Sequence, residues 1–100
     1  MAKRKIVWSS EAKIEFLEIL DFYYQRNGNA IYSRKLNKNI KNTISKLKTN
    51  PRLGINSNNK KIRVIIEGTY LIFYSISPTH VEILSIFDSR QNPEIFKYKK

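Results

Sequence analysis

Residues 60–88 read KKIRVIIEGTYLIFYSISPTHVEILSIFD, and this stretch decides the fold. It contains three runs rich in β-branched and aromatic residues, a composition that favours strands. The runs are Lys60–Glu67, Tyr70–Ser75 and Val81–Asp88. The links Gly68-Thr69 and Ser77-Pro78-Thr79-His80 have turn chemistry and are too short for a parallel crossover. We therefore predict an antiparallel meander whose central strand is the apolar segment 70–74.

Two amphipathic helices precede the meander. From Ser10 to Arg26 and from Ala30 to Lys48, apolar residues recur at the spacing of a helix that buries one face. Leu17 and Tyr24 widen the predicted apolar stripe of the first helix. The segment Asn27-Gly28-Asn29 ends that helix, because Gly and Asn accept the left-handed C-cap conformation. A break of this length predicts a helical hairpin.

The remaining segments complete a single domain spanning residues 1–100. Lys3–Trp8 is predicted to be a short strand, and Ser9 is a candidate N-cap for the first helix. Residues Leu53–Asn59 are predicted to be a polar loop. The predicted fold class is therefore α+β with the order β-α-α-β-β-β. The helical hairpin packs on one face of a mainly antiparallel sheet.

The charge of the chain is strongly positive and unevenly distributed. The net charge is +11, and residues 28–63 hold ten basic residues and no acidic one. Such a block favours an anionic partner, namely nucleic acid, the ribosome or an acidic peptide. The alternative is that the charge keeps a small domain soluble.

Familiar cofactor and metal signatures are missing from the sequence. There is no cysteine and no glycine-rich phosphate loop, and His80, the one histidine, falls in a predicted turn. We therefore predict no cofactor and no metal. Glu11, Glu15 and Glu18 are interpreted as a solvated helix face. The lack of cysteine and of a long apolar run predicts a cytoplasmic protein without a membrane segment.

A cationic site is the remaining chemical possibility. Lys60, Lys61 and Arg63 open one predicted strand, and Arg90 follows the last. Basic side chains that converge can bind a phosphodiester and stabilise charge during its attack. Aromatic residues nearby can stack on bases or simply belong to the core. These aromatic residues are Tyr70, Tyr74, Phe87 and Phe96.

Taken together, segments along nearly the whole chain resemble the RelE/ParE superfamily of type II toxin–antitoxin toxins, and the ParE branch in particular. The matching segments occur in the family's order. They are Ile6–Lys13, Leu17–Tyr23, Asn50-Pro51-Arg52-Leu53-Gly54, Ile62-Arg63-Val64, Tyr70–Tyr74, Val81–Leu84 and Arg90-Gln91-Asn92-Pro93. The resemblance implies a toxin that a cognate antitoxin neutralises. RelE-like members cut messenger RNA on the ribosome, whereas ParE-like members inhibit DNA gyrase without cleavage.

The residues that RelE-like cleavage uses are only partly present. Lys61, Arg63 and Arg90 match the basic catalytic positions, but Leu71 stands where those nucleases carry an arginine. Phe96 stands where they carry a tyrosine, and a missing proton-transfer group costs roughly 100- to 10,000-fold in rate. The sequence therefore favours the ParE-like function. The chain is an enzyme only if it is RelE-like.

We expect a toxin that binds gyrase through its basic residues. The predicted target-binding residues are Arg34, Lys38, Lys41, Arg63, Arg90 and Tyr98. The alternatives are a ribosome-dependent ribonuclease and a non-toxic partner-binding module. In each case the antitoxin is expected to be acidic where it crosses the second helix and apolar where it meets the sheet. The complex is expected to be a hetero-oligomer.

Overall fold

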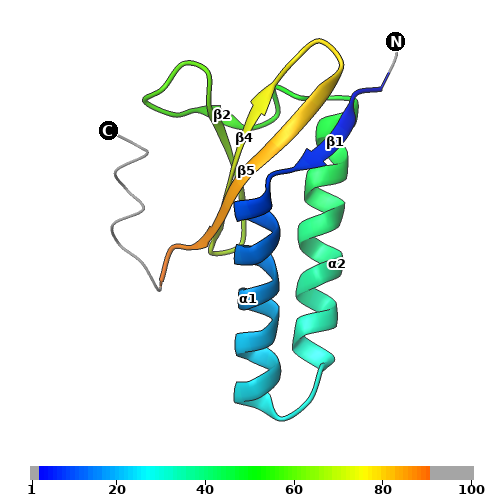
Figure 1. Cartoon of the computed structure of the whole chain (residues 1–100), viewed down its shortest axis with the longest axis vertical. Helices are drawn as coiled ribbons and strands as arrows, with labels where there is room; N and C mark the ends of the chain where they lie inside the picture. The colour runs from blue at the N-terminus through cyan, green and yellow to red at the C-terminus, as the bar shows by residue number, and fades with distance from the viewer. Residues whose placement is uncertain (1–2, 91–100) are drawn as a thin grey trace.

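The computed structural model describes residues 3–90 and forms two layers, a helical hairpin and a five-stranded sheet (Figure 1). The elements follow one another along the chain as β1 (Lys5–Trp8), α1 (Ser10–Asn27), α2 (Ile31–Ser45), a 3-10 turn η1 (Lys46–Lys48), β2 (Ile55–Asn56), β3 (Arg63–Glu67), β4 (Tyr70–Ile76) and β5 (His80–Asp88). The predicted α+β class with a helical hairpin on the sheet is confirmed. The hairpin extends past the sheet, so its 28–30 link lies beyond the strands.

The sheet has the strand order β1-β5-β4-β3-β2. Strands β2 to β5 are antiparallel neighbours, while β1 runs parallel to β5 at one edge. The predicted meander is confirmed, with β4 in its centre. Strand β2 was not predicted, because it consists of only two residues, Ile55 and Asn56, in a polar stretch. These residues pair with Val64 and Arg63 of β3.

The main core lies between the hairpin and the sheet. Side chains from both helices meet the inward face of β3, β4 and β5 there. The buried members are Ala12, Phe16, Leu36, Ile40, Ile44, Leu47, Ile65, Tyr70, Ile72, Tyr74, Val81, Ile83 and Ile86. Three buried residues, Val64, Leu71 and Phe73, form a second cluster with Leu84 and Phe87.

A bulge in β5 determines where α1 docks. Phe73 pairs with Ser85 but Tyr74 pairs with Ile83, so Leu84 is an extra residue in the ladder. The Ser9 hydroxyl donates to the Leu84 carbonyl (3.0 Å) and accepts from Ala12 N (3.0 Å) as the helix N-cap. The start of α1 is therefore fixed to the bulge.

Glu15 completes this attachment one turn further along α1. Its carboxylate accepts from the Ser85 hydroxyl (2.7 Å) and from the Ile86 backbone N–H (3.0 Å). The interpretation of Glu15 as part of a solvated face was therefore wrong, because the bulge presents donors that the sequence pattern does not reveal. Burial raises the pKa of Glu15, and the two hydrogen bonds offset part of that rise.

The outward face of α1 is more apolar than the pattern suggests. Leu17 and Tyr24, predicted to widen the buried stripe, are 64% and 49% exposed. Ile14, also exposed, lies on the same side of the helix. The buried stripe is narrower because α1 packs mainly against α2 and β5.

The Tyr74 hydroxyl holds the loop that leads into β2. It donates to the Pro51 carbonyl (2.8 Å) and accepts from Gly54 N (2.9 Å). A Cβ at Gly54 would lie 2.6 Å from that hydroxyl and 2.5 Å from the Val64 carbonyl oxygen, so the loop approaches the sheet more closely than a side chain permits.

Replacing Tyr74 by Phe should lower the free energy of unfolding by about 1–3 kcal/mol, because a buried N–H and a carbonyl lose their partner. Urea unfolding measures the change. The matched control is Tyr24→Phe, which removes an exposed hydroxyl and should change stability by less than about 0.5 kcal/mol. Equal effects of the two variants would contradict this role of Tyr74.

Candidate functional site

The outward face of α2 carries an uncompensated row of cations. Arg34, Lys38 and Lys41 are all exposed and lie opposite the buried residues Leu36 and Ile40. The helix contains no acidic residue, so no carboxylate along it balances these charges. The three residues form one surface, as the helical spacing requires, and we call it the α2 cationic face.

Arg63 lies at the end of the sheet where β2 joins. Its guanidinium donates to Asn56 Oδ1 (2.7 Å) and to the carbonyls of Gly54 (2.6 Å) and Arg52 (3.1 Å). These bonds hold the 52–56 loop against β3. Lys60 and Lys61 are exposed nearby, and both line a cavity of about 430 Å³ beside Arg63.

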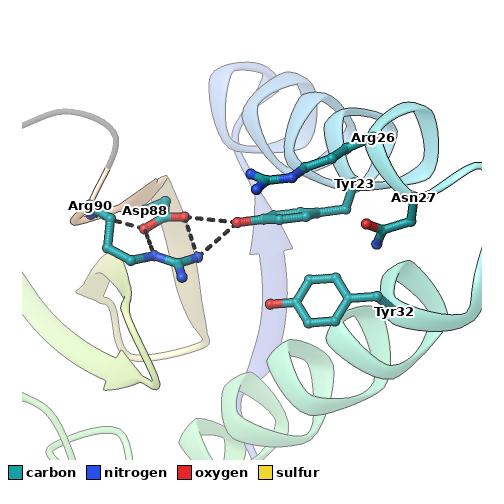
Figure 2. A pocket seen from close by; sticks show the side chains of 6 residues that line it. All are labelled: Tyr23, Arg26, Asn27, Tyr32, Asp88 and Arg90. Atoms are coloured by element: carbon teal, nitrogen blue, oxygen red, sulfur yellow. Dashed lines mark hydrogen bonds and ion pairs between the residues drawn. The ribbon is translucent and has the colours of Figure 1, made fainter.

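Arg90 lies at the other end of the sheet, beside the helical hairpin. Its Nη2 donates to Asp88 Oδ2 (2.9 Å) and to the Tyr23 hydroxyl (2.7 Å), and its Nε donates to Asp88 Oδ1 (3.2 Å). The Tyr23 hydroxyl in turn donates to Asp88 Oδ2 (3.3 Å). Figure 2 shows this triangle between β5 and α1. The Asp88 side chain is 1% exposed, whereas that of Arg90 is 55% exposed.

The triangle sets the ionisation of both partners. Burial raises the pKa of Asp88, but the hydrogen bonds and positive charge of Arg90 outweigh it, and the net pKa is lowered. Hydrogen bonding to Asp88 and the Asp88 charge raise the pKa of Arg90. Asp88 is thus a buried carboxylate that stays charged because one exposed arginine pairs with it.

A cavity of about 520 Å³ opens beside this triangle, and we call it the tyrosine cavity. Side chains from α1, α2 and the end of β5 line it. They are Tyr23, Arg26, Asn27, Tyr32, Asp88 and Arg90. The Tyr23 and Tyr32 rings meet edge to face with centroids 4.7 Å apart. In the sequence, the signal for this cavity is the polar pair Asp88 and Arg90 at the end of an apolar strand, which was not predicted to be a site.

The three basic residues predicted for catalysis are not brought to one point. Arg63 pairs with Tyr74, whereas Asp88, two residues before Arg90, pairs with Tyr70. At about 3.3 Å per residue, these pairing positions lie roughly 13 Å apart along β4. Hydrogen bonds hold each arginine at its own end of the sheet, and Lys61 lies at the Arg63 end.

Two tail residues discussed from the sequence lie outside the described residues. They are Phe96, a possible stacking residue, and Tyr98, a predicted target-binding residue. Within residues 3–90, no helix is long and apolar enough to span a membrane. The same residues contain no group of three or more histidine, aspartate or glutamate side chains arranged to hold a metal ion.

Comparisons with known proteins identify the same family across most of the chain. The family profile described as the ParE toxin of the type II toxin–antitoxin system parDE matches residues 6–93. A solved structure described as the chromosomal ParDE toxin–antitoxin system from P. aeruginosa superimposes with a TM-score of 0.73 at 17% sequence identity, covering 86% of this chain and 96% of that chain. At this identity the structural likeness shows the fold. A comparison with curated protein sequences gives no match.

Replacing Asp88 by Asn should lower the free energy of unfolding at pH 7 by about 1–3 kcal/mol, because a charged acceptor of buried hydrogen bonds is lost. The lowered pKa of Asp88 means that its contribution is present above its unfolded pKa, about 4, and is lost as the pH falls through the folded value. The stability gap between wild type and variant should therefore narrow in acid.

Urea unfolding at a series of pH values from neutral down to strongly acidic measures this gap. Asp21→Asn is the matched control, because Asp21 is exposed and accepts one long hydrogen bond, from Gln25. A gap for Asp88→Asn that stays constant or widens in acid would contradict the assignment.

Proposed function

Because the chain belongs to the ParE toxin family of type II toxin–antitoxin systems, we propose that it inhibits DNA gyrase and is neutralised by an acidic antitoxin. The single observation that carries the proposal is the α2 cationic face. Three exposed cations on a helix without acidic residues form a surface that attracts a negatively charged partner. DNA held by gyrase and acidic protein segments both offer such charge.

The separation of the arginines supports a binding toxin over the ribonuclease alternative. Cleavage at one phosphate needs basic groups that reach the same reacting atoms. Arg63 and Lys61 lie at one end of the sheet, and Arg90 lies at the other. The Arg63 guanidinium also holds the 52–56 loop against β3. Replacing Arg63 would therefore disturb the structure of that loop, whatever its effect on catalysis.

The antitoxin surface includes the α2 cationic face and the neighbouring edge of the sheet. A cavity of about 380 Å³ lies between the C-terminal half of α2 and β3, lined by Thr43, Lys46, Glu67 and mostly apolar residues of the sheet edge. Leu53, Ile55 and Ile66 are 45%, 61% and 52% exposed. An antitoxin segment that is acidic along α2 and apolar at β3 complements both surfaces.

Purified toxin is expected to inhibit DNA supercoiling by gyrase at micromolar concentration, and the cognate antitoxin should relieve the inhibition. The double variant Lys38→Glu, Lys41→Glu should weaken inhibition at least about tenfold, because two positive charges that attract the partner become negative charges that repel it. Conversion of relaxed plasmid to the supercoiled form on gels is the readout.

The control is Lys60→Glu, Lys61→Glu, which makes the same change of charge in the loop before β3, outside the α2 cationic face, and should retain inhibition. An inactive wild-type toxin would count against the gyrase proposal. Equal losses in the two double variants would instead show that net charge, and not the α2 cationic face, determines inhibition.

The rate of association with the antitoxin should fall steeply as salt is added, because charge complementarity acts mainly on the encounter of the partners. Stopped-flow fluorescence at several salt concentrations gives this rate. Lys38→Glu, Lys41→Glu should flatten the dependence, whereas Lys60→Glu, Lys61→Glu should leave most of it. A wild-type rate that does not depend on salt would contradict the proposed contact.

A further inference from the structure

The tyrosine cavity carries an excess of positive charge that no ion pair within residues 3–90 neutralises. Arg26 and Arg90 both line it, and Asp88 is the one acidic side chain among the lining residues. Because Asp88 is already paired with Arg90, Arg26 remains as an unbalanced cation. The cavity therefore favours a ligand with a negative charge.

Donors for such a ligand are in place. Arg90 uses Nε and Nη2 for Asp88 and Tyr23, while its Nη1 makes no hydrogen bond to any of the described residues. The Arg26 guanidinium likewise makes no ion pair with any of the residues 3–90. Figure 2 shows the Tyr23 and Tyr32 hydroxyls directed toward Asp88 and Arg90, with Arg26 over Tyr23. These groups converge from three elements.

A buried tyrosine hydroxyl lies behind the tyrosines of the cavity. Tyr70 is 4% exposed, and its hydroxyl has no hydrogen-bond partner among the described residues. Burial, followed by the neighbouring Tyr23 and Tyr32, raises the pKa of Tyr70, so it stays a protonated donor. Tyr70 is not among the side chains that line the cavity, so its hydroxyl contributes a buried polar group behind Tyr23 and Tyr32.

The cavity also offers aromatic surface and an amide. The Tyr32 side chain is partly exposed, at 38%, and its ring is held by its edge-to-face contact with Tyr23. Asn27 lines the same cavity and carries both a donor and an acceptor. Planar bases stack on such rings, and amide side chains hydrogen-bond their edges.

We propose that the tyrosine cavity binds a nucleotide, with the phosphate between Arg26 and Arg90 and the base against Tyr32. Arginine pairs with phosphate through short, charge-assisted hydrogen bonds, and the pre-positioned Arg90 loses little freedom on binding. The proposal goes beyond gyrase inhibition and does not depend on it. The nucleotide is either free or part of a nucleic-acid strand, which presents the same phosphate and base.

Titrations of the purified full chain at physiological salt test the proposal, with binding located by amide chemical shifts. The probes are adenosine monophosphate, adenosine, inorganic phosphate and a short single-stranded DNA. Adenosine monophosphate should bind more tightly than adenosine or phosphate alone and should shift the amides of residues 23–32 and 88–90. Tighter binding of the DNA at the same amides would identify a nucleic-acid strand as the source of the nucleotide.

Arg26→Gln should weaken binding of adenosine monophosphate by at least about tenfold, the usual value of a hydrogen bond to a charged group. Tyr32→Ala should remove the advantage of adenosine monophosphate over phosphate. The matched controls Arg52→Gln and Tyr24→Ala change exposed residues elsewhere and should bind like wild type. All four replaced side chains are exposed, and circular dichroism checks that each variant is folded.

No response to adenosine monophosphate or to DNA at millimolar concentration would overturn the proposal. Binding that shifts only the α2 cationic face, or that Arg52→Gln weakens as much as Arg26→Gln, would also overturn it. Gyrase is absent from these titrations, so failure of the gyrase proposal and failure of nucleotide binding are separate results.

Discussion

The attachment of α1 to the bulge in β5 is the constraint on which the rest of the structure depends. At and just after the extra residue, Leu84, β1 no longer pairs with β5, and Ser9 and Glu15 bond to the Leu84 carbonyl and the Ile86 N–H from the helix side. Because these contacts are directional, α1 has one position on the sheet. The bulge also lets Ile83 and Ile86, three residues apart, face the same core.

Two functional consequences follow from that position. With α1 fixed on β5, α2 packs beside α1 and over β3. The α2 cationic face is therefore on the side of α2 opposite the sheet. The same placement brings Tyr23 on α1 to Asp88 at the end of β5, where Arg90 joins them. The basic residues discussed above, Arg34, Lys38, Lys41, Lys61, Arg63 and Arg90, are thus divided among an outward helix face and two opposite ends of one sheet.

Much of the fold follows from local sequence signals, whereas the sites follow from register. Turn chemistry and apolar periodicity predict the meander and the hairpin, and helical spacing alone places Arg34, Lys38 and Lys41 together. No local signal reveals the bulge, so Glu15 was assigned to solvent. Convergence of Arg63 with Arg90 depends on which residues pair across β4, and that register is a property of the assembled sheet.

Independence of the two arginine sites is the claim that one measurement tests most directly. Urea unfolding midpoints of Arg63→Gln, Arg90→Gln and the double variant give the coupling between the two residues. Residues in separate sites have additive effects, whereas residues of one network do not. The loss in the double variant should therefore equal the two single losses added together. A double variant no less stable than the weaker single variant would contradict the division of the sheet into two ends.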